Sequence, residues 1–153
     1  MTALWLGASA EEASVVFLLP NKPILPDHYD SRFLKAPDIN QLIELNGNHW
    51  RKILTIMAKL LSPNDDTWRE HRERHLWSRL GVCFSAKQVS GYKGLLFVVG
   101  HTFRQSYPVS GMAQIVGDKH VAYVNLPYVW CPYLDYRQFP NVLISALRAQ
   151  ILE

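Results

Sequence analysis

Two apolar runs decide the fold expected from this sequence: Gly94-Leu-Leu-Phe-Val-Val-Gly100 and Val121-Ala-Tyr-Val-Asn-Leu126. Both lie within residues 93–140, and each is followed by polar and aromatic residues suited to lining a cleft. These are His101 to Arg104 after the first run and Pro127 to Phe139 after the second. Short, continuously apolar runs indicate strands covered on both faces, as in a parallel sheet. The segment therefore predicts buried strands that end at a binding edge.

Further strands and helices are expected on either side of this segment. Ser14-Val-Val-Phe-Leu-Leu19 is a third apolar run, closed by a proline. Shorter stretches at 3–6, 82–84 and 112–116 predict additional strands, whereas 127–139 is too rich in proline and aromatic residues for a regular element. Apolar residues at helical spacing predict helices at 38–46, 48–61, 63–80 and 140–151.

Strands that alternate with helices favour a sheet sandwiched between helices. We therefore expect residues 1–153 to form a single three-layer α/β/α domain with a mostly parallel central sheet. Ligands of such folds bind beyond the carboxyl ends of the strands. Those ends are expected at Pro20-Asn21, Gly100-His101 and Leu126–Tyr128.

The composition fits an ordinary soluble globular domain, with 153 residues, 48% hydrophobic and 19% charged. A chain of this length needs no metal or disulfide to fold. The N-terminus lacks the basic start of a signal peptide, and no apolar run is long enough to span a bilayer. These features predict a cytoplasmic protein with no membrane association, and they leave its oligomeric state open.

The charge is unevenly distributed, although the net charge is only +3. Residues 51–93 carry nine basic side chains against four acidic ones. Such a region attracts anions or nucleic acid, or it is simply the solvated surface of helices. Both interpretations stay open at this stage.

Several chemistries are not supported by the motifs. His71 and His75 have a spacing used by zinc ligands, but two arginines lie between them and disfavour a cation, so we expect no metal and no cofactor. Neither phosphate-binding glycine loop is present, and no nucleophile elbow occurs. Cys83 and Cys131 have no motif spacing, and Cys131 is expected to be a buried thiol rather than a nucleophile.

Two constellations remain as candidate ligand-binding sites. His101 follows an expected central strand and Arg104 lies three residues later, so the two can bind an anion or orient a polar ligand; alternatively His101 holds the loop through its backbone. The segment 128–139 combines aromatic rings with Asp135 and Arg137, a mixture that suits stacking on a flat ring or a loop packed over the sheet. With the first strand end included, the expected ligand-binding residues are Asn21, His101, Arg104, Tyr128, Asp135 and Arg137.

The order of elements resembles that of the uracil-DNA glycosylase superfamily. The shared features are an apolar strand ending at Gly100, a second strand at 121–125, a proline-bearing loop, a terminal helix and the prolines at 20–23. The resemblance implies a related sandwich fold. It places the family's His-Pro-Ser loop on 126–128, where only the proline is shared, and its catalytic loop near 20–29, where Asn21 and Asp27 are candidates.

Three functions are consistent with these observations. The first is an uncharacterised domain that binds a small polar or aromatic ligand at the strand ends. The second is a degenerate glycosylase-like protein that acts on nucleobases or nucleic acid, with Asn21 or Asp27 positioning water. The third is a protein-interaction domain that uses the helix carrying Trp68 and Trp77. The sequence does not decide whether the protein is an enzyme.

Overall fold

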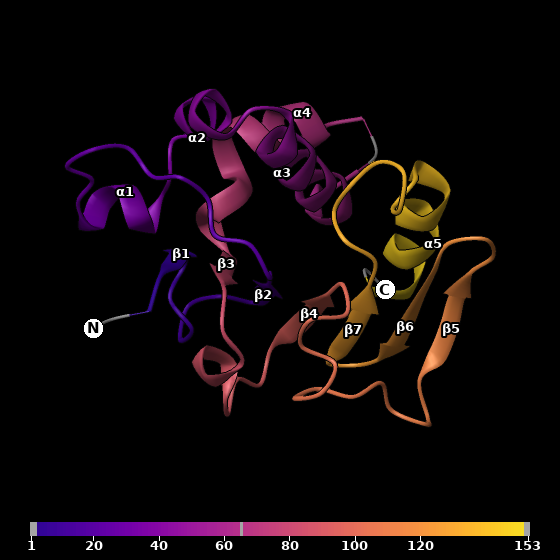
Figure 1. Cartoon of the computed structure of the whole chain (residues 1–153). Helices are drawn as coiled ribbons and strands as arrows, with labels where there is room; N and C mark the ends of the chain where they lie inside the picture. The colour runs from indigo at the N-terminus through magenta and orange to yellow at the C-terminus, as the bar shows by residue number, and fades with distance from the viewer. Residues whose placement is uncertain (1–2, 65, 152–153) are drawn as a thin grey trace.

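The computed structural model describes residues 3–64 and 66–151, and seven strands form one sheet in it (Figure 1). The order across the sheet is β1-β3-β2-β4-β7-β6-β5. The strand bounds are β1 Trp5–Gly7, β2 Val15–Leu18, β3 Leu80–Cys83, β4 Leu95–Val99, β5 Gln114–Gly117, β6 Val121–Asn125 and β7 Tyr128–Cys131.

The sheet is mixed, so the expected mostly parallel sheet is not confirmed. The four adjacent strands β3, β2, β4 and β7 are parallel, while β1, β6 and β5 pair antiparallel. The reason lies in the connections. Only Leu126 and Pro127 separate β6 from β7, and so short a link forces the chain to reverse, whereas a parallel pair needs a long crossover.

The strand β7 was not expected, because prolines and aromatic residues dominate this part of the sequence. The structure places Pro127 and Pro132 just outside the strand, at its two ends. Only the four residues between them pair with neighbouring strands, so no ladder hydrogen bond is lost to a proline inside β7.

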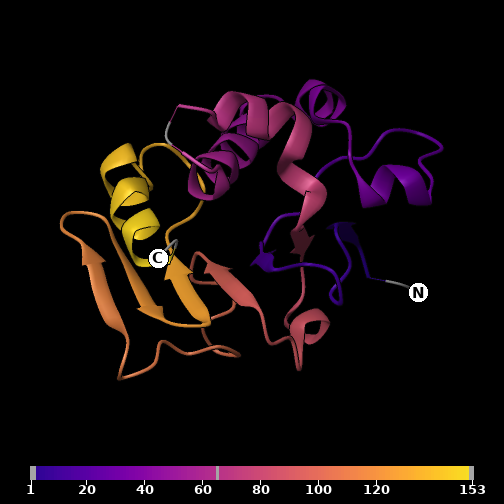
Figure 2. The same ribbon diagram turned by 180° about the vertical axis from the view of Figure 1, so that it is seen from behind.

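The α-helices cover one side of the sheet, as the two opposite views show (Figures 1 and 2). The Asp38 carboxylate accepts a hydrogen bond from the Gln41 amide at 2.9 Å and caps the start of α2, as the three-residue spacing of Asp38 and Gln41 predicts.

The region 63–80 is not one helix but a succession of α, π and 3-10 turns. The helix bounds are α1 Ser31–Lys35, α2 Ile39–Asn46, α3 Asn48–Leu61, α4 Trp68–Glu70, π-helix His71–His75, 3-10 helix Leu76–Ser78, 3-10 helix Ala86–Val89 and α5 Asn141–Ile151.

The two faces of the sheet are covered differently. On the helical face, Phe17, Phe97 and Trp50 lie in a large buried cluster, and the two phenylalanine rings stack with centroids 4.3 Å apart. On the other face, Val16 and Leu96 belong to a smaller cluster. The 3-10 helix Ala86–Val89 and irregular segments cover this second face with side chains such as Val89, Phe103, Tyr107 and Val109. The expected three-layer arrangement, with helices on both faces, is therefore not confirmed.

The four parallel strands end together at one edge, which we call the carboxyl edge. Leu18 pairs with Cys83 and Val98, and Val99 pairs with Cys131. The strand ends at Pro20-Asn21 and Gly100-His101 were predicted to lie at this edge, and both do. The third, Leu126–Tyr128, does not, because β6 is antiparallel to β7 and ends at the opposite edge.

Candidate functional site

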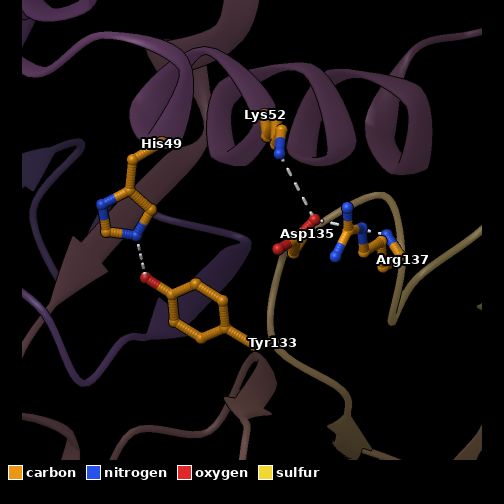
Figure 3. A network of polar contacts seen from close by, with 5 residues as sticks. All are labelled: His49, Lys52, Tyr133, Asp135 and Arg137. Atoms are coloured by element: carbon orange, nitrogen blue, oxygen red, sulfur yellow. Dashed lines mark hydrogen bonds and ion pairs between the residues drawn. The ribbon is translucent and has the colours of Figure 1, made fainter.

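The carboxyl edge carries a polar group built from three distant segments. The Tyr133 hydroxyl lies 2.5 Å from Nε2 of His49, and Nδ2 of Asn21 donates a hydrogen bond to the same hydroxyl at 3.1 Å. Asn21 follows β2, Tyr133 follows β7, and His49 lies in the first turn of α3. We call these three residues the Tyr133 site; Figure 3 shows His49 and Tyr133 facing each other across the gap between α3 and the loop.

The local fold explains why these side chains meet. Pro132 follows β7, and the next residue, Tyr133, lies beside Gly100, the residue that follows β4. Gly100 has a φ of 71°, a left-handed conformation that favours glycine. A Cβ added at Gly100 would lie 4.0 Å from Cδ1 of the Tyr133 ring, so the ring lies close to the end of β4.

A charged pair lies next to the Tyr133 site along α3 (Figure 3). Nζ of Lys52 is 3.6 Å from an Asp135 carboxylate oxygen, and the same oxygen accepts a hydrogen bond from the Arg137 amide at 3.2 Å. Asp135 therefore both shapes its own turn and joins the loop to α3. The Arg137 side chain is exposed. The edge thus presents a phenol, an imidazole, an amide and charges of both signs within one short region.

The Tyr133 hydroxyl is held in its neutral form. Burial raises its pKa, the hydrogen bond from Asn21 acts in the opposite direction, and the Asp135 carboxylate raises the pKa further. A neutral phenol offers one donor and two acceptor positions, while an asparagine amide offers two donors and an acceptor. These groups have more hydrogen-bond donors and acceptors than their two mutual contacts use. The remaining donors and acceptors can therefore bind a ligand.

Four of the six predicted ligand-binding residues lie at or beside this edge. Asn21 belongs to the Tyr133 site, and Asp135 and Arg137 lie in the loop next to it. His101 directly follows Gly100 and its side chain is exposed. The segments that carry these four residues therefore end at the same edge, and their binding of a ligand stays a prediction.

The other two predicted residues are not part of the Tyr133 site: Tyr128 lies at the opposite edge, whereas Arg104 lies over β6 near the Cys131 end of β7. Tyr128 is the first residue of β7 and lies at the opposite edge. Its ring centroid is 5.8 Å from that of Trp130, on which it stacks, and 6.2 Å from that of Tyr107. The Arg104 guanidinium lies over the ring of Tyr123, 5.6 Å from its centroid. The sequence argument was wrong about Tyr128 because it took Pro127 to follow a strand end, whereas Pro127 precedes a strand. The same fact moves 126–128, the segment matched to the His-Pro-Ser loop, away from the carboxyl edge.

Sequence reasoning missed His49, Lys52 and Tyr133 as site residues. His49 and Lys52 lie on α3 outside its apolar face, and that position was the available signal. Tyr133 was recognised only as one of several aromatic residues in 128–139. Its role depends on the exact end of β7, which the sequence did not reveal.

The buried thiols and the histidine pair lie outside the Tyr133 site. Cys83 and Cys131 are free and buried, and burial raises the pKa of both thiols, that of Cys83 to about 12, which disfavours nucleophilic thiolates. His71 and His75 lie in the π-helix with ring centroids 6.3 Å apart. Burial, and then the proximity of His75, lower the pKa of His71. In the described part of the chain, no cluster of three or more histidine, cysteine, aspartate or glutamate side chains is arranged to hold a metal.

A cavity of about 600 Å³ lies away from the carboxyl edge, between the linker joining α1 to α2 and the π-helix. Arg72 and Trp77 line it. The Trp77 indole donates a hydrogen bond to the Pro37 carbonyl at 2.9 Å and is half-buried, as is Trp68. Both indoles therefore pack largely within the monomer.

The comparisons with known proteins give a family without an assigned function. The profile of a family of unknown function, DUF6942, matches residues 6–152. The chain belongs to this family. No curated protein and no solved structure matches the DUF6942 chain. Among its described residues, no helix has both the length and the apolarity needed to cross a bilayer.

Alkaline pH is expected to destabilise the protein through Tyr92, Tyr107 and Tyr133. Burial raises the pKa of all three hydroxyls above the ordinary value of about 10. Their contribution to stability is therefore fully present below pH ~10 and is lost as the pH rises through the folded-state pKa values. Tyrosinate absorbance should show these three of the seven tyrosines ionising late, and Tyr92→Phe should reduce the alkaline loss of stability. Simultaneous ionisation of all seven tyrosines in the folded protein would contradict this.

Proposed function

We propose that this DUF6942 protein binds a small polar or aromatic ligand at the carboxyl edge of its sheet, in contact with the Tyr133 site. The observation that carries the proposal is the shared hydroxyl of Tyr133, on which side chains from two other segments converge. Asn21 and His49 are exposed, so both are accessible to a ligand. Convergence of polar groups at the ends of parallel strands is typical of ligand sites in open α/β sheets.

The neighbouring groups define the chemistry of the ligand. The flat rings of Tyr133 and His49 stack with centroids 5.7 Å apart and leave edges that can hydrogen-bond a planar molecule. Lys52 and Arg137 supply positive charge, and Asp135 supplies negative charge. A flat ring with both donors and acceptors, such as a nucleobase, fits this mixture better than a purely apolar molecule.

Tyr133→Phe is expected to weaken nucleobase binding about tenfold, because the substitution removes the hydroxyl and its hydrogen bonds while the ring stays in place. The measurement is a titration of the isotope-labelled protein with uracil and with adenine, followed by the amide shifts of residues 20–22, 48–50 and 132–134. Tyr128→Phe is the matched control, since it removes the same group at the opposite edge and should leave binding unchanged. Equal effects of the two substitutions, or shifts confined to other residues, would contradict the proposal.

A second candidate is an enzyme that acts on nucleobases or nucleic acid, as the resemblance to the uracil-DNA glycosylase superfamily implies. One observation favours it: the loop with Asn21, where the resemblance places catalytic residues, lies at the same edge as Tyr133 and His49. The test is release of uracil from a single-stranded oligonucleotide that contains it. Activity should be lost in Asn21→Ala or Asp27→Ala, and an inactive wild-type protein would reject this candidate.

The interaction hypothesis receives less support. Trp68 and Trp77 are half-buried, and Trp77 already has a hydrogen-bond partner in Pro37. A docking surface would require a contiguous exposed apolar patch larger than a few hundred Å². Three cationic side chains surround Trp68, and such an environment suits an anionic ligand better than an apolar protein surface.

A further inference from the structure

Three positively charged side chains surround the indole of Trp68. Nζ of Lys59 lies 5.0 Å from the ring centroid, and the guanidinium carbons of Arg69 and Arg72 lie at 5.1 and 5.6 Å. Contacts of this kind occur about once per 70–80 residues, so three on one ring are unusual. We call Lys59, Arg69 and Trp68 the Trp68 cluster, because Arg72 is otherwise engaged.

The positive charge around the Trp68 indole is only partly offset. Arg72 pairs with Glu73 at 2.7 Å and donates a hydrogen bond to the Thr55 hydroxyl at 2.9 Å. For Lys59 and Arg69, no carboxylate of the described residues lies within salt-bridge distance. Burial lowers the pKa of Lys59, and the nearby charge of Arg69 lowers it further. Two like charges held this close are unfavourable until an anion binds between or beside them.

A cavity of about 270 Å³ opens at the cluster, lined by Lys59, Trp68, Asn141, Ile144 and Ser145. Nζ of Lys59 is fixed there by a hydrogen bond to the Asn141 side-chain oxygen at 3.0 Å. The cavity is smaller than the 300–1,000 Å³ typical of sites for drug-sized molecules, so it suits one compact group. A lysine ammonium, a hydroxyl and an amide are groups that bind phosphate oxygens.

We propose that the cavity at the Trp68 cluster binds a phosphate group of a ligand. Lys59 supplies the direct positive charge, Arg69 adds to the attraction, and Ser145 and Asn141 supply hydrogen bonds. The indole of Trp68 offers a face for a ring attached to the phosphate. The ligand is either a free phosphorylated molecule or a single strand of nucleic acid, and the two sources present the same group.

Neighbouring residues extend the surface toward the carboxyl edge. Tyr136 is 46% exposed, and both Lys52 and Lys59 lie over its ring, at 5.7 and 5.9 Å from the centroid. Lys52 and Lys59 are seven residues apart on α3 and therefore share one face of the helix. The phosphate site does not depend on the proposed function of the Tyr133 site, and it can be tested separately.

The test compares charge removal at the cluster with charge removal elsewhere. Pyrophosphate binding is measured by calorimetry, and binding of a fluorescein-labelled single-stranded oligothymidylate by anisotropy. Lys59→Gln and Arg69→Gln should each weaken binding at least about tenfold, whereas Lys59→Arg should retain most of it. Lys87→Gln, which removes an exposed lysine in the 3-10 helix Ala86–Val89, is the matched control and should have no more than about a twofold effect.

Each outcome has a defined meaning. If both probes depend on Lys59 and Arg69, the site accepts a nucleic-acid strand, and affinity should fall as salt rises. If only pyrophosphate binding depends on Lys59 and Arg69, the natural ligand is a free phosphorylated molecule. The proposal is overturned if neither probe binds at about 1 mM, which corresponds to only ~4 kcal/mol of binding, or if Lys87→Gln weakens binding as much as Lys59→Gln. Tyr133→Phe should not change phosphate binding, so failure of one site is distinguishable from failure of the other.

Discussion

Gly7→Ala is expected to destabilise the protein by roughly 2–5 kcal/mol, from positive-φ strain and overpacking combined. Gly7 ends β1 with a φ of 87°, a conformation that costs any residue with a Cβ. The added methyl group would clash with the Leu80 carbonyl oxygen and lie 2.7 Å from Cε3 of Trp77. The carbonyl belongs to the backbone of the neighbouring strand, so it cannot move without disturbing the pairing of β1 with β3. Urea denaturation of the two proteins measures the difference.

Gly91→Ala is the matched control for this substitution. Gly91 has a φ of 81°, close to that of Gly7, but a Cβ there would meet no atom within 4 Å. The loss of unfolding free energy in Gly91→Ala therefore comes only from backbone strain and is about 1–2 kcal/mol. Any additional loss in Gly7→Ala is due to the clash. Equal losses at the two positions would show that the clash with Leu80 and Trp77 does not contribute to the destabilisation.

The existence of most elements could be predicted from the sequence, because the signals are local. The apolar runs at 14–19 and 94–100 became β2 and β4, and the helical spacing over 48–61 became α3. Asp38 and Gly47 mark the start and end of α2, as cap residues should. The region 63–80 was different, since its partial apolar face did not reveal the change from α to π geometry at 71–75.

The arrangement of the strands could not be predicted to the same extent. A continuously apolar strand has no alternation that fixes which residue faces which side, so its partner and direction are weakly specified by the sequence. β7 shows the consequence. With Tyr128–Cys131 interpreted as a loop, Tyr128 was placed at the binding edge and Tyr133 was overlooked, although the two residues lie at opposite ends of the same strand.

The candidate site was predicted only where it depended on strands already recognised. Asn21 and His101 follow β2 and β4, which pair in parallel, so both lie at the edge that the sequence predicts for them. His49 and Lys52 reach the edge from α3, and placing them requires the angle at which that helix crosses the sheet. That angle is set by packing between buried residues such as Trp50 and Met57 and the strands, which involves contacts far apart in the chain.

Arg148→Met is expected to destabilise the protein by about 2–4 kcal/mol, since buried carbonyl groups lose their donor. Nη1 of Arg148 lies 2.7 Å from the Lys59 carbonyl, 3.3 Å from that of Leu60 and 3.0 Å from that of Ser62. These carbonyls are at the end of α3, where the helix itself supplies no partner, and the positive charge also opposes the negative end of the helix dipole. Methionine keeps much of the apolar stem but none of the donors.

Arg148→Lys is the control that separates charge from geometry. Lysine keeps the charge near the end of α3, but its shorter side chain does not bring the ammonium to the position of Nη1, the one atom that contacts all three carbonyls. We expect it to recover about half of the lost stability in urea denaturation and thermal melting. Because the contact joins α5 to the turn that contains Lys59, the methionine variant should also weaken pyrophosphate binding at the Trp68 cluster. A methionine variant as stable as the wild-type protein would mean that water replaces the guanidinium at these carbonyls.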